Sequence, residues 1–413
     1  MARVLPLISR LISALIVCLA GFALAAPDDG SAAPLTESEA VQSGLQVAAW
    51  RDWVDSSMSE AHNRTLATGR LDNPEIEFVD ESLDLPGGNT ERSYWLRQHL
   101  DLTGRNSLER KSARAAESVT SADIGLIERE RAKAIRGSFY QAIRLRGETE
   151  AIENWRARLT ELSQAVAERV EAGDASRFDH LRIEREKTLL DGRLAARRAE
   201  LASARERLFG FLESRPRPLA GRLLPGEPPT AATVMAALHE HPEIAGLHAG
   251  AESDQLAARA AAREAWPEVT LGVGIKELEE GPISETGGMF SVALEIPLFK
   301  RGRQRRAAAE AGAGAKSAKA ALATARLESE ARAVLDELAA RRAAALAMRA
   351  ELDGDTNSLP ELAEAAYRAG ELGVMSLIDA WQTELELRLQ AIELEYAARV
   401  AAIELMQLTG ETK

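Results

Sequence analysis

The segments RVEAGDASRFDHLRIE (Arg169–Glu184) and YRAGELGVMSLIDA (Tyr367–Ala380) each place a glycine where one long helical pattern stops and another begins. Stretches rich in alanine, leucine and charged residues flank both segments, and this composition favours helix. Gly173 and Gly370 lie 197 residues apart in a chain of 413. A glycine can adopt the left-handed conformation that ends a helix. Each segment therefore predicts a tight connection between two antiparallel helices.

A second pair of segments repeats with nearly the same separation. NPEIEFVDESLDLPGGNTERSYWLRQHLDLTGRN (73–106) has the same order of features as WPEVTLGVGIKELEEGPISETGGMFSVALEIPLFKRGR (266–303). Both have Pro-Glu near their start and Gly-Arg near their end, just before a long helical pattern. In both, apolar and polar residues alternate on either side of a Gly-rich region. The closing glycines, Gly104 and Gly302, lie 198 residues apart. These separations indicate an internal duplication of about 195 residues.

Each repeat predicts a helix, two paired strands, a very long helix and a shorter returning helix. Helices are expected over about 34–68, 105–170 and 177–212, and again over about 230–264, 303–369 and 375–409. The second copy of the first helix should start near HPEI, because Pro242 suits an early helical position. The segment DGDTNSLPE (353–361) should bend or break the second long helix, because Pro360 lacks an N–H.

A Pro-rich segment, ESRPRPLAGRLLPGEPPT, separates the two repeats. The predicted regions are a signal peptide at 1–25, a first repeat at 26–212, an equatorial linker at 213–229 and a second repeat at 230–413.

The long helices carry coiled-coil spacing. Ile378, Trp381, Leu385, Leu389, Ile392 and Tyr396 step by 3, 4, 4, 3 and 4 residues, which places them on one stripe. The chain is 28% charged and only 4% aromatic, a composition typical of long helices packed by small residues. The predicted fold class is therefore mainly α with a small β part, built from a duplicated unit of coiled-coil helices and a β-hairpin.

The predicted strands are apolar on one face and charged or small on the other. In the second repeat Val269, Leu271, Val273 and Ile275 alternate with polar or small residues. This pattern fits either an ordinary half-buried sheet or a membrane barrel with a wet lumen. A four-stranded sheet in lipid would leave two open edges, so it would have to close with copies of itself. Two copies would give eight strands with room for side chains alone, whereas three copies would give twelve strands around an aqueous pore.

The N-terminus predicts a secretory signal. Arg3 and Arg10 precede the apolar stretch LISALIVCLAGFALA, which ends on an A-x-A cleavage pattern. The single cysteine, Cys18, lies inside this segment, and Val17 before it disfavours a lipoprotein signal. A mature chain without cysteine forms no disulfide. No later run of 18 apolar residues predicts a transmembrane helix.

The duplicated order, together with HPEI, YRAGELGVMSLIDA and the signal, resembles the TolC-like outer-membrane efflux family. LDLTGR (100–105) and IPLFKRGR (296–303) resemble its CzcC-like cation-efflux branch. The resemblance covers about residues 35–410. It implies a homotrimer in outer-membrane lipid, with a twelve-stranded β-barrel on an α-helical periplasmic tunnel. It also implies two protein partners: a periplasmic adaptor protein and a proton-driven inner-membrane pump of the resistance-nodulation-division type.

The resemblance also implies roles for residues near the two glycine tips. Tyr367 should bond Asp179, and Asp379 should belong to the constriction of a gate. Ser376 stands where the family can have another constricting aspartate, and Leu372 stands where the archetype has an arginine. The expected adaptor-docking tips are Gly173, Asp174, Ala175 and Ser176 in the first repeat and Gly370, Glu371, Leu372 and Gly373 in the second.

The sequence favours no enzyme, cofactor or nucleic-acid partner. A net charge of −13 disfavours general nucleic-acid affinity. GAGAKS (312–317) departs from the P-loop pattern, and its small residues indicate close packing of a helix. His239, His241 and His248 are interpreted as surface residues rather than a metal site. Two other function classes remain open: a periplasmic coiled-coil adaptor, and a secreted structural coiled coil. Neither explains the two pairs of amphipathic strands as well as an export duct does.

Overall fold

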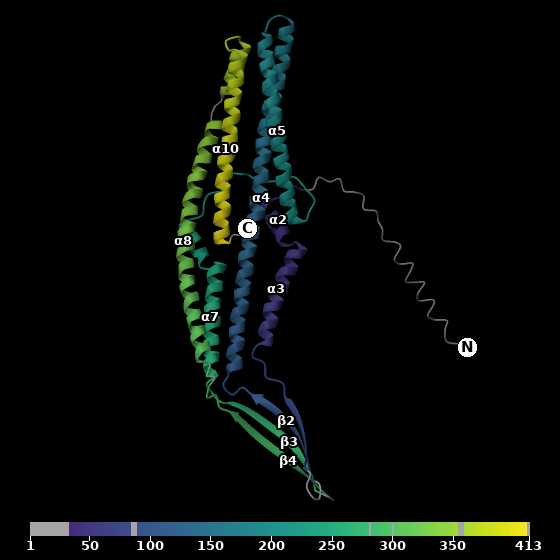
Figure 1. The fold of residues 1–413 in the computed structure, drawn as a ribbon. Coiled ribbons are helices and arrows are strands. Elements are labelled where there is room, and N and C mark those ends of the chain that lie inside the picture. Colours follow the sequence, from purple (N-terminus) through teal and green to yellow (C-terminus); the bar gives the residue numbers. More distant parts are fainter. Residues whose placement is uncertain (1–32, 84–88, 281, 300, 354–358, 411–413) are drawn as a thin grey trace, which may run out of the picture.

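The computed structural model describes residues 33–83, 89–280, 282–299, 301–353 and 359–410. The molecule is long and narrow, with a β-sheet at one end and two helical tips at the other (Figure 1). The predicted signal peptide at 1–25 lies outside the described residues, as do residues 84–88 of the first Gly-rich region and 354–358 of DGDTNSLPE.

Helices make up most of the fold, in two similar sets. The first repeat contains α2 (Glu37–Leu45), α3 (Ala48–Ala67), α4 (Arg105–Glu171) and α5 (Arg177–Leu212). The second contains α6 (Ala231–Leu238), α7 (Pro242–Arg263), α8 (Arg303–Asp353), α9 (Leu359–Arg368) and α10 (Val374–Thr409). The duplicated unit predicted from the sequence is confirmed. Helix α4 is continuous over 67 residues, which at 1.5 Å per residue is about 100 Å.

The expected single helix over 34–68 is wrong, because the chain turns between α2 and α3. Gln46 ends α2, and Val47 is extended with φ −55° and ψ 132°. Gly44 lies so close to α4 that a Cβ at this position would collide with Ile135. The turn lets Val41 and Val47, one on each side, both be buried.

The expected helix over 230–264 is also two helices. Pro242 is the first residue of α7, as predicted, but α6 precedes it as a separate helix. The residue before a proline avoids the helical conformation, and His241 is extended with φ −64° and ψ 129°. In the second long helix, α8 ends at Asp353 and α9 begins at Leu359, with Pro360 in its first turn.

The sheet joins the two repeats. Strands β1 (Glu75–Leu83), β2 (Asn89–Leu100), β3 (Glu268–Glu280) and β4 (Ile283–Glu295) pair in sequence order, all antiparallel. Strand β2 of the first repeat pairs with β3 of the second, with Tyr94 opposite Ile275. This central pairing leaves β1 and β4 as the two edge strands of the single chain.

Three apolar clusters hold the helices together. One lies near the middle of the molecule around Phe139 and Leu208, a second lies near the tips around Trp155 and Trp381, and a third lies between α6, α8 and α10. The Pro-rich linker packs against the middle cluster, and its Leu219 forms a parallel β-bridge with Leu35.

Candidate functional site

The two helical tips are built by the same backbone motif. The Gly173 N–H donates to the Val170 carbonyl at 3.1 Å, and the Asp174 N–H donates to the Arg169 carbonyl at 2.8 Å. In the second tip the Gly370 N–H donates to the Tyr367 carbonyl at 3.0 Å, and the next residue bonds Ala366 at 2.9 Å. This pair of bonds is the Schellman motif. Both glycines have positive φ, +84° and +76°, and a Cβ on either would meet nothing within 4 Å.

Each return helix begins four residues after its tip glycine, so its N-cap residue lies three residues after that glycine. Ser176 caps α5 by accepting a hydrogen bond from the Phe178 N–H at 3.1 Å. Gly373 takes the same position before α10 and has no side-chain cap. Ala175 and Leu372 pack against the apolar cluster near the tips. Asp174 and Glu371 are exposed, so each tip presents backbone and one carboxylate to its surroundings.

The three gate residues predicted from the resemblance are not joined in the single chain. Tyr367, on α9, is half-buried against the tip cluster, and Asp179 lies half-buried in the first turn of α5. Asp379 is exposed on α10. Among the described residues, no hydrogen bond or ion pair links Tyr367 to Asp179.

Ser376 and Leu372, the two residues that differ from the pattern of the resembled family, differ in their exposure. Ser376 is exposed, whereas Leu372 packs against the tip cluster. The side chain in the place of the archetype's arginine therefore adds to the apolar packing of the tip and supplies no charge there.

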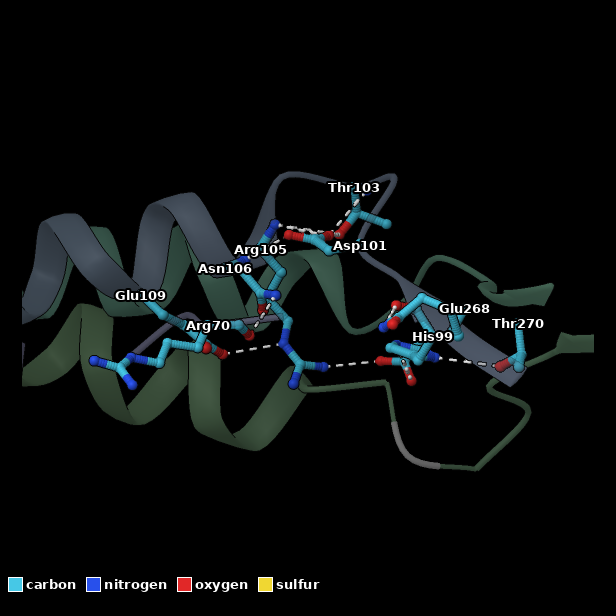
Figure 2. Close-up of polar contacts among 10 residues, drawn as sticks. Arg70, His99, Asp101, Thr103, Arg105, Asn106, Glu109, Glu268 and Thr270 are labelled. Atoms are coloured by element: carbon cyan, nitrogen blue, oxygen red, sulfur yellow. Dashed lines mark hydrogen bonds and ion pairs between the residues drawn. The ribbon is translucent and has the colours of Figure 1, made fainter. Parts of the chain in front are cut away.

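A polar joint, which the sequence analysis missed, connects the sheet to α4 (Figure 2). Asp101 accepts hydrogen bonds from the backbone N–H groups of Thr103, Arg105 and Asn106, at 3.0, 3.2 and 2.7 Å. Burial alone would raise the pKa of Asp101, but the bonds from Asn106, Thr103 and Arg105 hold it below its usual value. The carboxylate thus caps the first turn of α4, where negative charge is favoured.

Arg105 extends this joint across the two repeats. Its guanidinium donates to Glu109 one turn later at 3.0 Å and to Glu268, the first residue of β3, at 2.9 Å. Figure 2 shows Arg105 lying between the two carboxylates. His99 of β2 lies 3.6 Å from the other oxygen of Glu268. The motif LDLTGR therefore starts a helix and fastens it to the other repeat; an Asp-x-Thr-Gly sequence before a helical pattern was the available signal.

One face of the sheet is apolar and uncovered. Ile76 is 81% exposed and Phe290 is 69% exposed, and Tyr94, Leu96, Val273, Ile275, Val292 and Leu294 share their face and are also exposed. A contiguous exposed apolar surface of this kind marks contact with a partner or a membrane. The predicted alternation of the strands is confirmed.

The opposite face of the sheet is charged and lined with glycine. Trp95 of β2 lies against Gly274 of β3, where a Cβ would come within 2.9 Å of the indole and 2.6 Å of the Tyr94 carbonyl oxygen. The Arg97 guanidinium is 5.3 Å from the centre of the Trp95 ring and pairs with Glu77. The glycine thus leaves room for the indole to lie against β3.

The prediction that the three histidines are surface residues is wrong for His241. His241 is buried and caps α7, its Nδ1 accepting from the Glu243 N–H at 3.3 Å. Burial, helped by the charge of Arg129, lowers the pKa of His241 to about 4. His239 and His248 are exposed. Within the described ranges, no group of three or more histidine, cysteine or acidic side chains could hold a metal ion.

GAGAKS lies inside α8, as predicted, and packs against α7. Lys316 pairs with Asp254 at 2.8 Å and donates to the Gly250 carbonyl at 3.3 Å. Gly312 faces Asp254, where a Cβ would lie 2.7 Å from the carboxylate. The small residues therefore serve the approach of two helices.

Comparison with solved structures identifies this architecture. CusC, described in terms of transmembrane channel formation, aligns over 90% of this chain and 91% of its own, with a TM-score of 0.72 and 16% identity. The outer membrane protein VceC of Vibrio cholerae aligns over 91% of this chain and 96% of its own, with a TM-score of 0.70 and 14% identity. The chain shares their fold. The open-state outer membrane channel MtrE of Neisseria gonorrhoeae aligns over 91% of this chain and 88% of its own, with a TM-score of 0.71 and 14% identity.

No family model matches the sequence, and no curated protein matches it. Across the residues that the structure describes, no helix combines the length and the apolar character needed to cross a membrane.

Proposed function

We propose that this protein is the outer-membrane channel of a tripartite efflux system, a passive export duct without catalytic activity. The observation that carries the proposal is the sheet at one end of the molecule, with one apolar face uncovered and two edge strands unpaired. Lipid would cover such a face, and the helices, of which α4 is about 100 Å long, would project from the membrane. The shared fold with CusC, VceC and MtrE supports this assignment.

The open edges favour a homotrimer. In a bilayer, backbone groups at a sheet edge have no water to bond, so the sheet must close on copies of itself. Three chains with the four strands of one sheet each would give twelve strands and an aqueous pore. We assign residues 1–25 as a cleaved signal peptide without lipidation at Cys18, 26–212 and 230–413 as the repeats, and 213–229 as their linker.

The helical tips are the proposed contact with a periplasmic adaptor, which would couple the channel to a proton-driven inner-membrane pump. Small residues at Gly173 and Gly370 leave the backbone accessible to a partner helix. In the closed trimer, Tyr367 and Asp179 would hydrogen-bond across neighbouring helices, and Asp379 from three chains would surround the opening. Both assignments rest on the resemblance to the efflux family.

The proposed substrates are cations or small molecules, and we favour cations, as in the CzcC-like branch. LDLTGR and IPLFKRGR support this choice. The polar face of the sheet also carries more acidic than basic residues, including Glu75, Glu77 and Glu268 against Arg97 and Lys276. A ring of carboxylates in a pore favours cations.

Membrane fractionation and native mass spectrometry test the proposal together. The protein should stay with outer membranes after a carbonate wash, and the detergent-solubilised protein should have the mass of three chains. Planar bilayers containing the trimer should show single-channel currents. Release by carbonate, or a monomer in detergent, would contradict the channel assignment.

A further inference from the structure

The two repeats differ where the sheet meets the long helices. Asn73 of the first repeat corresponds to Trp266 of the second, because NPE aligns with WPE. Asp101 corresponds to Phe299, because each stands three residues before the glycine of a Gly-Arg pair. Trp266 is 59% exposed and Phe299 is 96% exposed. The second repeat therefore has two uncovered aromatic rings in the places of an amide and a helix-capping carboxylate.

The charge of the two strand-to-helix connections differs in the same way. Residues 98–108 (QHLDLTGRNSL) contain one acidic and one basic residue, so their net charge is zero with histidine neutral. The matching residues 296–306 (IPLFKRGRQRR) contain five basic residues and no acidic one. The net charge of the whole chain is −13, so this connection is a local exception, and its charge favours an anionic partner.

Two of the arginines in this connection have no acidic partner. Arg305 and Arg306 each pair with a glutamate of the same chain, at 2.9 and 2.8 Å. Arg301 and Arg303 are exposed, and neither pairs with an acidic side chain of the described residues. The Arg301 Nε donates to the Pro297 carbonyl oxygen at 3.3 Å, which leaves its charge uncompensated. These two guanidinium groups are therefore available to an anion from outside the chain.

The aromatic rings and arginines continue the apolar face of the sheet. Glu268 at the start of β3 is opposite Glu295 at the end of β4, so Trp266 and Ile296 lie at the same end of the sheet, beside the base of α8 (Figure 1). Ile296 and Leu298 are exposed and follow directly on the exposed apolar residues of β4. Moving toward the helices, apolar side chains thus give way to exposed rings and then to arginines. Hydrocarbon, interface and headgroups follow one another in this order at a membrane surface.

The chemistry of these side chains matches a phospholipid with a net negative charge. Tryptophan is favoured at the boundary between acyl chains and headgroups, and a guanidinium group forms paired hydrogen bonds with phosphate. Basic residues beside a membrane attract anionic lipids. We propose that Trp266, Phe299, Arg301 and Arg303, the basic-aromatic patch, bind an anionic phospholipid on the side of the membrane from which the helices project. This inference rests on the proposed function for the membrane, and on the difference between the repeats for the charge of the lipid.

Photo-cross-linking in cells identifies what covers the patch. A benzoylphenylalanine in place of Phe299 should form adducts with phospholipid, detected by mass spectrometry. The same residue in place of Phe290, on the apolar face of β4, tests the membrane assignment itself. In place of Phe178, which is exposed on α5, it is the control and should form no lipid adduct.

The cross-links separate failure of the patch from failure of the channel assignment. Lipid adducts at Phe290 together with only protein adducts, or none, at Phe299 would overturn the patch and leave the channel assignment intact. Lipid adducts at neither position would overturn both.

The charge of the lipid is tested in phosphatidylcholine nanodiscs with a small fraction of phosphatidylglycerol that is spin-labelled near its headgroup. The Trp266 fluorescence is the difference between the protein and its Trp266→Phe variant. It should be quenched about threefold more by this lipid than by spin-labelled phosphatidylcholine at the same fraction. Sodium phosphate at constant ionic strength should not reduce the preference. Equal quenching by both lipids would overturn the anionic ligand, and loss of the preference in phosphate would overturn the lipid as its source.

Arginine variants connect the preference to the patch. Arg301→Gln/Arg303→Gln should remove most of the preference for phosphatidylglycerol, whereas Arg301→Lys/Arg303→Lys keeps the charge and should retain it. Arg182→Gln/Arg193→Gln removes two exposed charges from α5 and should leave the preference unchanged. If the lysine variant loses the preference as completely as the glutamine variant, or if the α5 variant weakens it equally, the charges of Arg301 and Arg303 do not bind the lipid.

Discussion

Ser112 of α4 and Ser253 of α7 form reciprocal hydrogen bonds: each hydroxyl donates to the other residue's carbonyl oxygen at 2.9 Å. The two serines are 141 residues apart and belong to different repeats. Their short side chains let the two helices approach closely while adding directional bonds. Arg105 and Glu268 form a second link between the repeats at the sheet. The repeats are therefore joined both at the sheet and about two turns of α4 beyond it.

The two glycines that precede the long helices should differ in their tolerance of alanine. Gly104 and Gly302 both have positive φ, +72° and +64°. A Cβ on Gly104 meets nothing within 4 Å, whereas a Cβ on Gly302 would collide with the Ala261 carbonyl oxygen. Gly104→Ala should cost only the left-handed conformation, about 1–2 kcal/mol. Gly302→Ala should cost clearly more. Denaturant unfolding monitored by circular dichroism checks the difference, and equal losses would contradict it.

Arg399 should be essential for holding the Pro-rich linker. This buried arginine donates to the carbonyl oxygens of Arg222, Leu223 and Leu224 at 2.8, 2.9 and 3.0 Å and stacks over Tyr140. Arg399→Met should lower the free energy of unfolding by about 2–3 kcal/mol, because it leaves acceptors unsatisfied. It should also expose the linker to limited proteolysis.

The control for this change is Arg193→Met, which removes an exposed arginine from α5. It should alter neither stability nor the cleavage pattern. A linker that resists protease equally in both variants would show that other contacts hold it.

His241 should make stability fall in mild acid. Its pKa is about 4 in the folded protein against an ordinary 6.5. Between these values the unfolded chain binds a proton that the folded chain does not, so stability is lost as the pH drops through this window. His241→Asn keeps an N-cap acceptor and removes this titration. Thermal unfolding at pH 7 and pH 5 should show a larger loss for the parent than for the variant. Equal losses would mean that His241 does not contribute.

Breaking the proposed gate should raise resting conductance. A hydrogen bond to a carboxylate contributes roughly 1.5–3 kcal/mol, and a trimer would contain three. Tyr367→Phe with Asp179→Ala should therefore increase leak current in planar bilayers. Asp379→Asn is the matched control, because it should weaken the preference for cations without opening the closed state. A double variant that conducts like the parent would place the gate elsewhere along the helices.

The tip glycines should tolerate replacement by a small residue but not by one with a long charged side chain. Asparagine adopts the left-handed conformation more readily than other residues, so Gly370→Asn should retain much of the export activity. Gly370→Lys should abolish export while the trimer stays in the membrane, because the long side chain would block a docking helix. Export assays with immunoblots of membrane fractions measure both. Normal export by the lysine variant would show that the tips are not part of the docking surface.

Periodicity was enough to predict the long elements. Helices α4, α5 and α10 and the two-faced strands follow from the apolar spacing of their own residues. The breaks after Leu45 and Leu238 were not predicted. The break after Leu45 depends on the close approach of Gly44 to Ile135, which the sequence alone does not show. The partnership of Arg105 with Glu268 was also missed, since nothing in either repeat alone specifies it.

The pairing of β2 with β3 sets an order for folding. Arg92 and Glu279, which interact across these strands, are 187 residues apart in sequence. The first hairpin is therefore synthesised long before the strand that covers the edge of β2. During that interval β2 presents an open edge, and open edges pair readily with the wrong chain. Protection of the first hairpin until β3 arrives, rather than the stability of the finished sheet, is thus the step at which production of this protein is most vulnerable.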